Sequence, residues 1–336
     1  MRKLKRLGTI LGTIFVFFLI INIIPPSKAV EHNPFIKGEN QKTMLAAHRG
    51  GADTNPENTM LAFKEAVNTY KVDILESDLY LTKDGYLVYN HDSYVDETCN
   101  INGNISLDEV EDLIEDKSKR HYIKDLTLEE LRTYNFGYYF ENKKDERLYN
   151  NLTHEEVVEK GLQIVEVSEL FRTFYESNPD LMFIVEIKNS NEKGYEAVDK
   201  LVQALDAFPN YKDQIVIGTF NPEIEDYLKE NHPTLYRGAS TKGAAGFVVT
   251  QMLRVNLFNT NSFACLQIPM EYDLGITIRL NKKTYIKRAH RRNIAVQYWT
   301  INDADEMREL IDLGCDAIMS DDLEVAREVI DTYKGK

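Results

Sequence analysis

Cysteine is scarce in this chain. Three cysteines, Cys99, Cys265 and Cys315, occur among 336 residues and lie far apart. Their spacing matches no known metal-site pattern, and their odd number leaves at least one without a partner in the chain. We therefore expect all three thiols to be buried or unpaired, and any metal site to be built from other side chains.

Basic residues are outnumbered. The chain has 40 Lys and Arg against 54 Asp and Glu, a net charge of −14. Residues 1–29 hold five basic and no acidic residues, so the remainder has a net charge of −19. A body this acidic repels polyanions at long range, which argues against nucleic acid as a partner. The hydrophobic share of 43% is ordinary for a globular protein and excludes wholesale disorder.

One long apolar run stands out, from about Leu7 to Ile24. A basic head at residues 2–6 precedes it, and small residues ending at Ala29 follow a Pro-Pro pair. This order is typical of a secretory signal, yet the run is also long enough to span a bilayer if it is retained. Residues 1–29 are thus predicted to be a signal peptide or a membrane anchor. In either case the basic flank stays in the cytoplasm and the body is extracytoplasmic, secreted or anchored to the membrane.

Residues 30–42 are polar and lack periodicity, as is typical of a linker. From residue 43 to residue 332, short apolar runs alternate with helical patterns, and eight such runs predict an α/β fold, a (β/α)8 TIM barrel. The expected strands are 44–47, 73–79, 181–187, 214–218, 234–238, 263–268, 294–299 and 315–319. The expected helices include 57–70, 192–208, 222–230, 243–257, 282–292 and 304–313, with Asn55-Pro56 starting the first.

The second expected strand is followed by a hairpin and an insertion. Residues 86–90 lie too close to that strand for a parallel crossover, so they are predicted to fold back antiparallel after the Asp84-Gly85 turn. This return brings His91 to the mouth of the barrel. The polar interval of about 93–161 fits no β-α repeat and is predicted to be an inserted cap subdomain, within which residues 108–120 are expected to be a solvated helix face.

Chemically active side chains gather where the strands end. The carboxyl ends of barrel strands share one mouth, and catalytic groups of such barrels lie there. Five strand ends carry such groups: His48 and Arg49, Glu76 and Asp78, Glu186 and Lys188, Trp299 and Asn302, and Asp321. Histidines suit acid and base chemistry, carboxylates suit a divalent cation, and an arginine suits phosphate. The combination indicates metal-assisted phosphodiester cleavage.

These segments resemble the glycerophosphodiester phosphodiesterase family. Its HRG, PENT, ExD, HD, ExK and WTxN motifs occur in order as residues 48–50, 56–59, 76–78, 91–92, 186–188 and 299–302. The resemblance covers roughly residues 44–332 and implies a phosphodiesterase TIM barrel with an insertion after the HD motif. Residues 165–168, Val-Glu-Val-Ser, depart from the family's Pro-Thr-Leu-like segment, and this difference touches the cap and the substrate entrance.

Carried over residue by residue, the resemblance implies a role for each matching position. His48 and His91 would be the catalytic acid and base. Glu76, Asp78 and Glu186 would be the ligands of a divalent cation, Mg²⁺ or Ca²⁺. Arg49 and Lys188 would contact the phosphate, and Trp299 would form a flat wall for the alcohol or else pack in the core.

Three acidic residues keep a more local interpretation. Glu57 is either a metal ligand or, as helix-dipole arguments favour, a supporting residue at a helix start. Asp321 and Asp322 are expected to cap the helix that follows the last strand.

The expected activity is therefore metal-dependent hydrolysis of glycerophosphodiesters to glycerol 3-phosphate and an alcohol. The substrate would be a small-molecule or lipid-derived phosphodiester. Two alternatives stay open. A lysophospholipase D or phospholipase acting on acylated lipids would need an apolar groove near the mouth, for which residues 243–257 are the candidate. A catalytically silent envelope-binding barrel would be expected to lack a histidine or a ligand, and none is missing.

Overall fold

A computed structural model describes residues 2–39, 41–273 and 275–335. Within these residues, eight parallel strands form a nearly closed barrel, in the order β6-β5-β4-β2-β1-β11-β10-β7. Strands β6 and β7 meet through a parallel bridge between Gly238 and Cys265, where the Ala239 N–H donates to the Cys265 carbonyl at 2.9 Å. The strands are β1 (Met44–Ala47), β2 (Ile74–Leu81), β4 (Met182–Ile187), β5 (Ile215–Gly218), β6 (Tyr236–Arg237), β7 (Cys265–Ile268), β10 (Ala295–Tyr298) and β11 (Ala317–Ser320).

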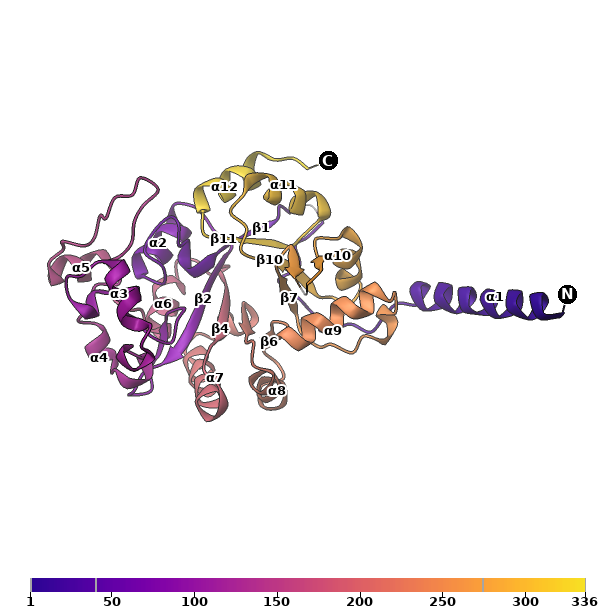
Figure 1. The fold of residues 1–336 in the computed structure, drawn as a ribbon, viewed down its shortest axis with the longest axis horizontal. Coiled ribbons are helices and arrows are strands. Elements are labelled where there is room, and N and C mark those ends of the chain that lie inside the picture. The colour runs from indigo at the N-terminus through magenta and orange to yellow at the C-terminus, as the bar shows by residue number, and fades with distance from the viewer. Residues whose placement is uncertain (1, 40, 274, 336) are drawn as a thin grey trace.

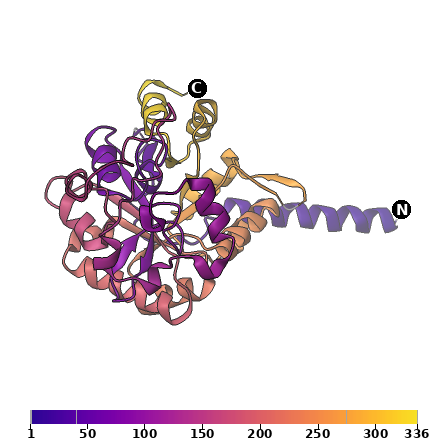
Figure 2. The same ribbon diagram turned by 60° about the vertical axis from the view of Figure 1, so that its left-hand side comes forward.

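Helices surround the barrel (Figures 1 and 2). They bury one apolar face against the strands, as the dominant core cluster shows. The predicted TIM barrel is confirmed, and each predicted strand matches an observed one. The helices are α2 (Met60–Asn68), α6 (Val167–Phe174), α7 (Asn191–Asp206), α8 (Pro222–Asn231), α9 (Thr241–Met252), α10 (Lys283–His290), α11 (Ala304–Leu313) and α12 (Leu323–Thr332).

Helix α2 begins later than predicted. Asn58 has a φ of 59°, which a right-handed helix excludes, so Asn55-Pro56 lies in a turn before the helix. The N-cap is Thr59, whose hydroxyl oxygen accepts from the Ala62 N–H at 3.2 Å. The PENT motif is therefore a turn at the mouth rather than a helical segment.

The hairpin and the insertion follow β2 as expected. Strand β3 (Leu87–Tyr89) pairs antiparallel with β2, with Leu79 opposite Tyr89. The insertion contains α3 (Leu107–Ile114), α4 (Leu128–Leu131) and α5 (His154–Lys160), and it has apolar clusters of its own. Residues 108–120 are not only a solvated face: Val110 and Ile114 are buried against Tyr138 and Tyr139.

The N-terminal segment contains helix α1 (Arg2–Ile23). By length and composition, residues 5–23 could cross a membrane. The predicted linker is more than a connection, because the Phe35 side chain is fully buried among inward-facing barrel residues. Asn22 contacts the loop before β7, and Arg291, just before β10, donates to the Asn22 carbonyl at 2.8 Å. Residues 22–35 thus join the barrel at the amino ends of its strands.

The three cysteines are buried and free, as the sequence predicted.

Candidate active site

One cavity of about 240 Å³ opens at the carboxyl ends of the strands. The structure brings eight of the predicted site residues together in its lining: His48, Arg49, Glu76, Asp78, His91, Glu186, Lys188 and Trp299. The ninth, Glu57, does not line the cavity, but its carboxylate accepts a hydrogen bond from Arg49, which does.

The His48-Arg49-Gly50-Gly51 turn places two of these side chains. After β1 the backbone turns with positive φ at Arg49, Gly50 and Gly51, of 51°, 83° and 96°. A Cβ on Gly51 would lie 2.6 Å from Leu323 Cδ1, so only glycine fits against α12. The turn thereby directs both the imidazole of His48 and the guanidinium of Arg49 toward the cavity.

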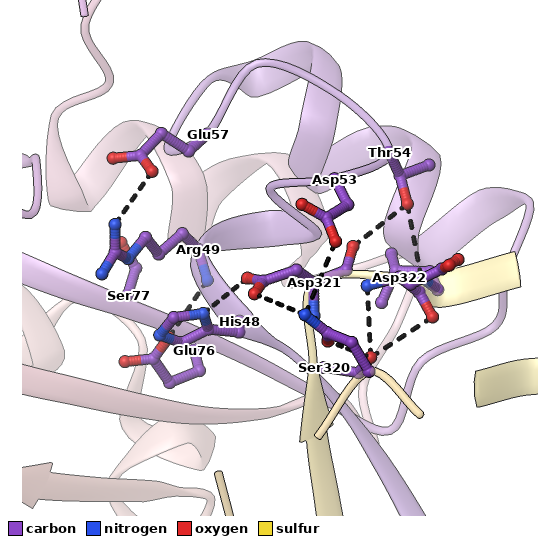
Figure 3. Close-up of polar contacts among 12 residues, drawn as sticks. His48, Arg49, Asp53, Thr54, Glu57, Glu76, Ser77, Ser320, Asp321 and Asp322 are labelled. Atoms are coloured by element: carbon purple, nitrogen blue, oxygen red, sulfur yellow. Dashed lines mark hydrogen bonds and ion pairs between the residues drawn. The ribbon is translucent and has the colours of Figure 1, made fainter. Parts of the chain in front are cut away.

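The imidazole of His48 lies between two carboxylates (Figure 3). Its Nδ1 is 2.6 Å from Asp321 Oδ1, and its Nε2 is 3.9 Å from Glu76 Oε2. An ionised carboxylate can only accept, so Asp321 holds the proton on Nδ1 and leaves Nε2 free for proton transfer. Burial lowers the pKa of His48, but the hydrogen bond and charge of Asp321 and the charge of Glu76 outweigh it and raise that pKa.

Asp321 is the functional residue that sequence reasoning misassigned. Both Asp321 and Asp322 were expected to cap α12, but Asp322 alone does so, accepting from the Val325 N–H at 3.2 Å. The carboxylate of Asp321 instead contacts His48 and accepts from Asn302 Nδ2 at 3.1 Å. Its position at the end of the last strand was the signal for this role.

Three carboxylates lie deep in the cavity beside one lysine. Lys188 Nζ is 3.0 Å from Asp78 Oδ1 and 3.1 Å from Glu186 Oε1. Glu76 accepts from the Arg49 N–H at 3.0 Å. Burial and, next, the neighbouring charge of Asp78 raise the pKa of Glu76 to about 8, and burial raises the pKa of Glu186 as well. These carboxyl groups are therefore crowded in a buried place, where a bound cation would favour their ionised forms.

The donor chemistry of this group fits a hard divalent cation. Glu76, Asp78 and Glu186 offer carboxylate oxygens, which Mg²⁺ and Ca²⁺ prefer. The Asp78 Oδ2 atom is buried and has no hydrogen-bond partner, as expected for a ligand atom. Among the described residues, no three His, Cys, Asp or Glu side chains are already arranged to hold a metal ion, and Lys188 contacts two of the carboxylates instead.

Glu57 acts on the site through Arg49. Its Oε2 accepts from Arg49 Nη1 at 3.0 Å, which holds the guanidinium at the rim (Figure 3). Since Glu57 does not line the cavity, its position favours the supporting role over the ligand role.

His91 and Trp299 complete the lining. His91 follows β3, and its Nδ1 is 3.3 Å from Asp92 Oδ1. The ring of Trp299 lies 6.3 Å from that of Phe220, which also lines the cavity. Sequence reasoning missed Phe220. Its position two residues after β5 placed it at the same mouth as the other strand ends.

The comparisons with known proteins agree with this arrangement. The family model described as the glycerophosphoryl diester phosphodiesterase family matches residues 48–325. A glycerophosphodiester phosphodiesterase of Caldanaerobacter subterraneus is 26% identical over 283 residues, covering 84% of this chain and 96% of the relative. A lysophospholipase D of Mus musculus is 28% identical over 301 residues, covering 82% of each chain.

Solved structures share the fold. A glycerophosphodiester phosphodiesterase from Agrobacterium tumefaciens superposes with a TM-score of 0.59 at 16% identity, over 85% of this chain and 99% of that one. An Oleispira antarctica phosphodiesterase in complex with the product sn-glycerol-3-phosphate has a TM-score of 0.60 at 19% identity, over 87% and 98% of the two chains. Because the family model spans most of the barrel and five of the six motifs contribute residues to one cavity, this chain belongs to the glycerophosphoryl diester phosphodiesterase family and is a phosphodiesterase.

Proposed function

We propose that this enzyme hydrolyses glycerophosphodiesters to glycerol 3-phosphate and an alcohol, with a divalent cation and with His48 and His91 as the acid/base pair. The observation that carries the proposal is that both histidines line one cavity together with Arg49, Lys188 and the three carboxylates. The Oleispira antarctica structure with sn-glycerol-3-phosphate supports the same product for this barrel.

The two histidines divide the proton transfers. One imidazole takes a proton from the attacking hydroxyl as its oxygen bonds to phosphorus. The other gives a proton to the alcohol oxygen as the phosphorus–oxygen bond breaks. Asp321 holds the His48 ring so that Nε2 faces the cavity, while Arg49 and Lys188 supply positive charge for the phosphate oxygens.

Glu76, Asp78 and Glu186 would hold the Mg²⁺ or Ca²⁺ ion. A bound cation would stabilise the negative charge that gathers on the phosphate oxygens during attack. The buried Asp78 Oδ2 atom accepts no hydrogen bond and would be one of the ligating oxygens.

The N-terminal helix supports an extracytoplasmic location. Residues 1–29 would be a signal peptide or an anchor, residues 30–42 would connect them to the barrel of 43–332, and residues 93–161 would form the cap. Membrane association would follow from α1 if it is not cleaved, since residues 5–23 could span a bilayer.

The test is release of glycerol 3-phosphate from glycerophosphocholine by the full chain in detergent, with EDTA, Mg²⁺ or Ca²⁺. We expect metal-dependent release that falls at least about 100-fold in His48→Ala and His91→Ala. The matched control is His154→Ala, an exposed histidine of α5 away from the cavity. Folded enzyme that releases nothing with any metal would contradict the proposal and leave acylated lipids, envelope polymers or a silent envelope-binding barrel as the alternatives.

The lysophospholipase D alternative needs an apolar groove at the mouth of the barrel, and residues 243–257 do not form one there. No residue of the apolar stretch 243–257 lines the cavity, and most of that stretch forms α9 on the outside of the barrel. The name of the mouse relative keeps acylated lipids as a second substrate to include in the assay.

A further inference from the structure

A second cavity of about 460 Å³ adjoins the first and shares Lys188 with it. Four lysines and no carboxylate line it. We call it the lysine cavity; its cations are Lys83, Lys124, Lys188 and Lys193. Lys188 and Lys193 are paired with carboxylates outside this lining, whereas Lys83 and Lys124 form no ion pair with the described residues. In a chain with a net charge of −14, two unpaired lysines in one carboxylate-free hollow leave it with a local excess of positive charge.

The four lysines come from separate parts of the fold. Lys83 lies in the turn between β2 and β3, Lys124 comes from the insertion, Lys188 follows β4, and Lys193 lies in the first turn of α7. Lys193 Nζ is 2.6 Å from Glu196, and Lys124 Nζ lies 5.4 Å from the centre of the Tyr122 ring. The cluster is therefore not the exposed face of a single helix, because four separate segments of the chain contribute to it.

The amino end of α7 adds donors to the same hollow. The N-cap residue Ser190 lines the cavity, yet its side chain accepts no capping hydrogen bond. The neighbouring Asn189 side chain is already used, accepting from the Leu81 N–H at 3.0 Å. The dipole of this 16-residue helix favours negative charge at its amino end, where Glu192 already lies in the first turn, so the helix supports the lysines without being a site by itself.

We propose that the lysine cavity binds a second phosphate group carried by the leaving alcohol of the substrate. The inference rests on the proposed function and extends it. The scissile phosphate would lie in the first cavity, the second phosphate in the lysine cavity, and Lys188 where the two hollows meet. Water gives a proton to the base histidine as its oxygen bonds to phosphorus, and the bond from phosphorus to the alcohol oxygen breaks. That oxygen takes a proton from the acid histidine, and the alcohol leaves with its own phosphate. The substrate class is thus a glycerophosphodiester with a further phosphate or phosphodiester.

The experiment compares glycerophosphoglycerol with the same compound phosphorylated on its leaving glycerol. The full chain in detergent is assayed as wild type, as Lys83→Gln/Lys124→Gln, and as the control Lys144→Gln/Lys160→Gln. The control changes two exposed lysines of the insertion that do not line the cavity.

For wild type we expect a kcat/KM about tenfold higher on the two-phosphate substrate, through a lower KM, with an advantage that shrinks as salt is added. The cavity variant should lose this advantage and keep its activity on glycerophosphoglycerol, while the control should match wild type. Equal kcat/KM on both substrates for wild type, or the same loss in the control, would overturn the proposal.

If neither substrate is cleaved by folded enzyme, the proposed function fails and calorimetry then decides on the subsite. Binding of the two-phosphate compound at least about fivefold tighter to wild type than to the cavity variant would support it. Equal binding would overturn it. Inorganic phosphate binding as tightly as the two-phosphate compound would show a site for free phosphate rather than for a substrate group.

Discussion

At His48 a single imidazole contacts a carboxylate on each side, and the two carboxylates have different duties. Asp321 holds Nδ1 at 2.6 Å, whereas Glu76 is 3.9 Å from Nε2, on the side of the cavity. A substitution that removes the charge of one carboxylate and keeps its shape shows what that carboxylate alone contributes.

Asp321→Asn should lower the pKa of His48. Burial alone lowers that pKa, and the hydrogen bond and charge of Asp321 are among the influences that raise it. Titration of the His48 ring signals by NMR measures the shift, and the ring of His121, which pairs with Asp96 at 2.7 Å, is an internal reference. An unchanged His48 pKa would show that Asp321 does not set its protonation.

The same variant should lose stability in a defined pH window. The pKa of Asp321 lies below its ordinary 3.8, and that of His48 lies above its ordinary 6.5. The pair stabilises the folded state once Asp321 is ionised, and it loses this effect as the pH rises through the raised pKa of His48. Asp321→Asn should therefore lower the thermal midpoint more at pH 5.5 than at pH 9, and an equal loss at both would contradict the ion pair.

At the scale of elements, the turn after β1 is the segment most sensitive to one added methyl group. Gly51→Ala should cost at least about 2 kcal/mol of unfolding free energy, because its φ of 96° is strained for alanine and Leu323 Cδ1 lies 2.6 Å from the new Cβ. Urea unfolding measures the loss.

Gly246→Ala is the control, since it lies within α9 and a Cβ there meets nothing within 4 Å. It should be neutral or stabilising by about 0.5 to 1 kcal/mol. Similar losses in both variants would contradict the steric argument.

The elements themselves could be predicted from the sequence because buried parallel strands read as short apolar runs. The starts of helices were harder. Asn55-Pro56 matches the local pattern of a helix start, but the positive φ at Asn58 moves the N-cap to Thr59. The site residues that belong to motifs at the ends of strands could be predicted from the sequence. The role of a residue was missed where its local sequence also suits another role. Asp321 looks like a cap because Asp322 beside it is one. Phe220 carries no polar group to mark it as part of a cavity.

At the scale of the whole molecule, Phe35 closes the amino end of the barrel. Its side chain is fully buried among inward-facing strand residues, although it comes from a stretch that lacks periodicity. Phe35→Ala should cost about 3 to 5 kcal/mol, because the cavity cannot collapse between the rigid strands. The exposed Phe258→Ala should change stability by less than about 0.5 kcal/mol. Denaturant titration compares the two, and equal effects would mean that Phe35 does not contribute to the core.

Helix α1 joins the barrel on the side away from the catalytic opening. The helix joins the body beside Arg291, before β10, while the cavity opens beyond the carboxyl ends of the strands, and Figure 1 shows α1 and the insertion at opposite ends of the molecule. If α1 is retained in the membrane, the barrel would therefore lie between the bilayer and the catalytic opening. An enzyme tethered in this way would take its diesters from the surrounding envelope or medium, and lipids of the supporting leaflet would lie behind it.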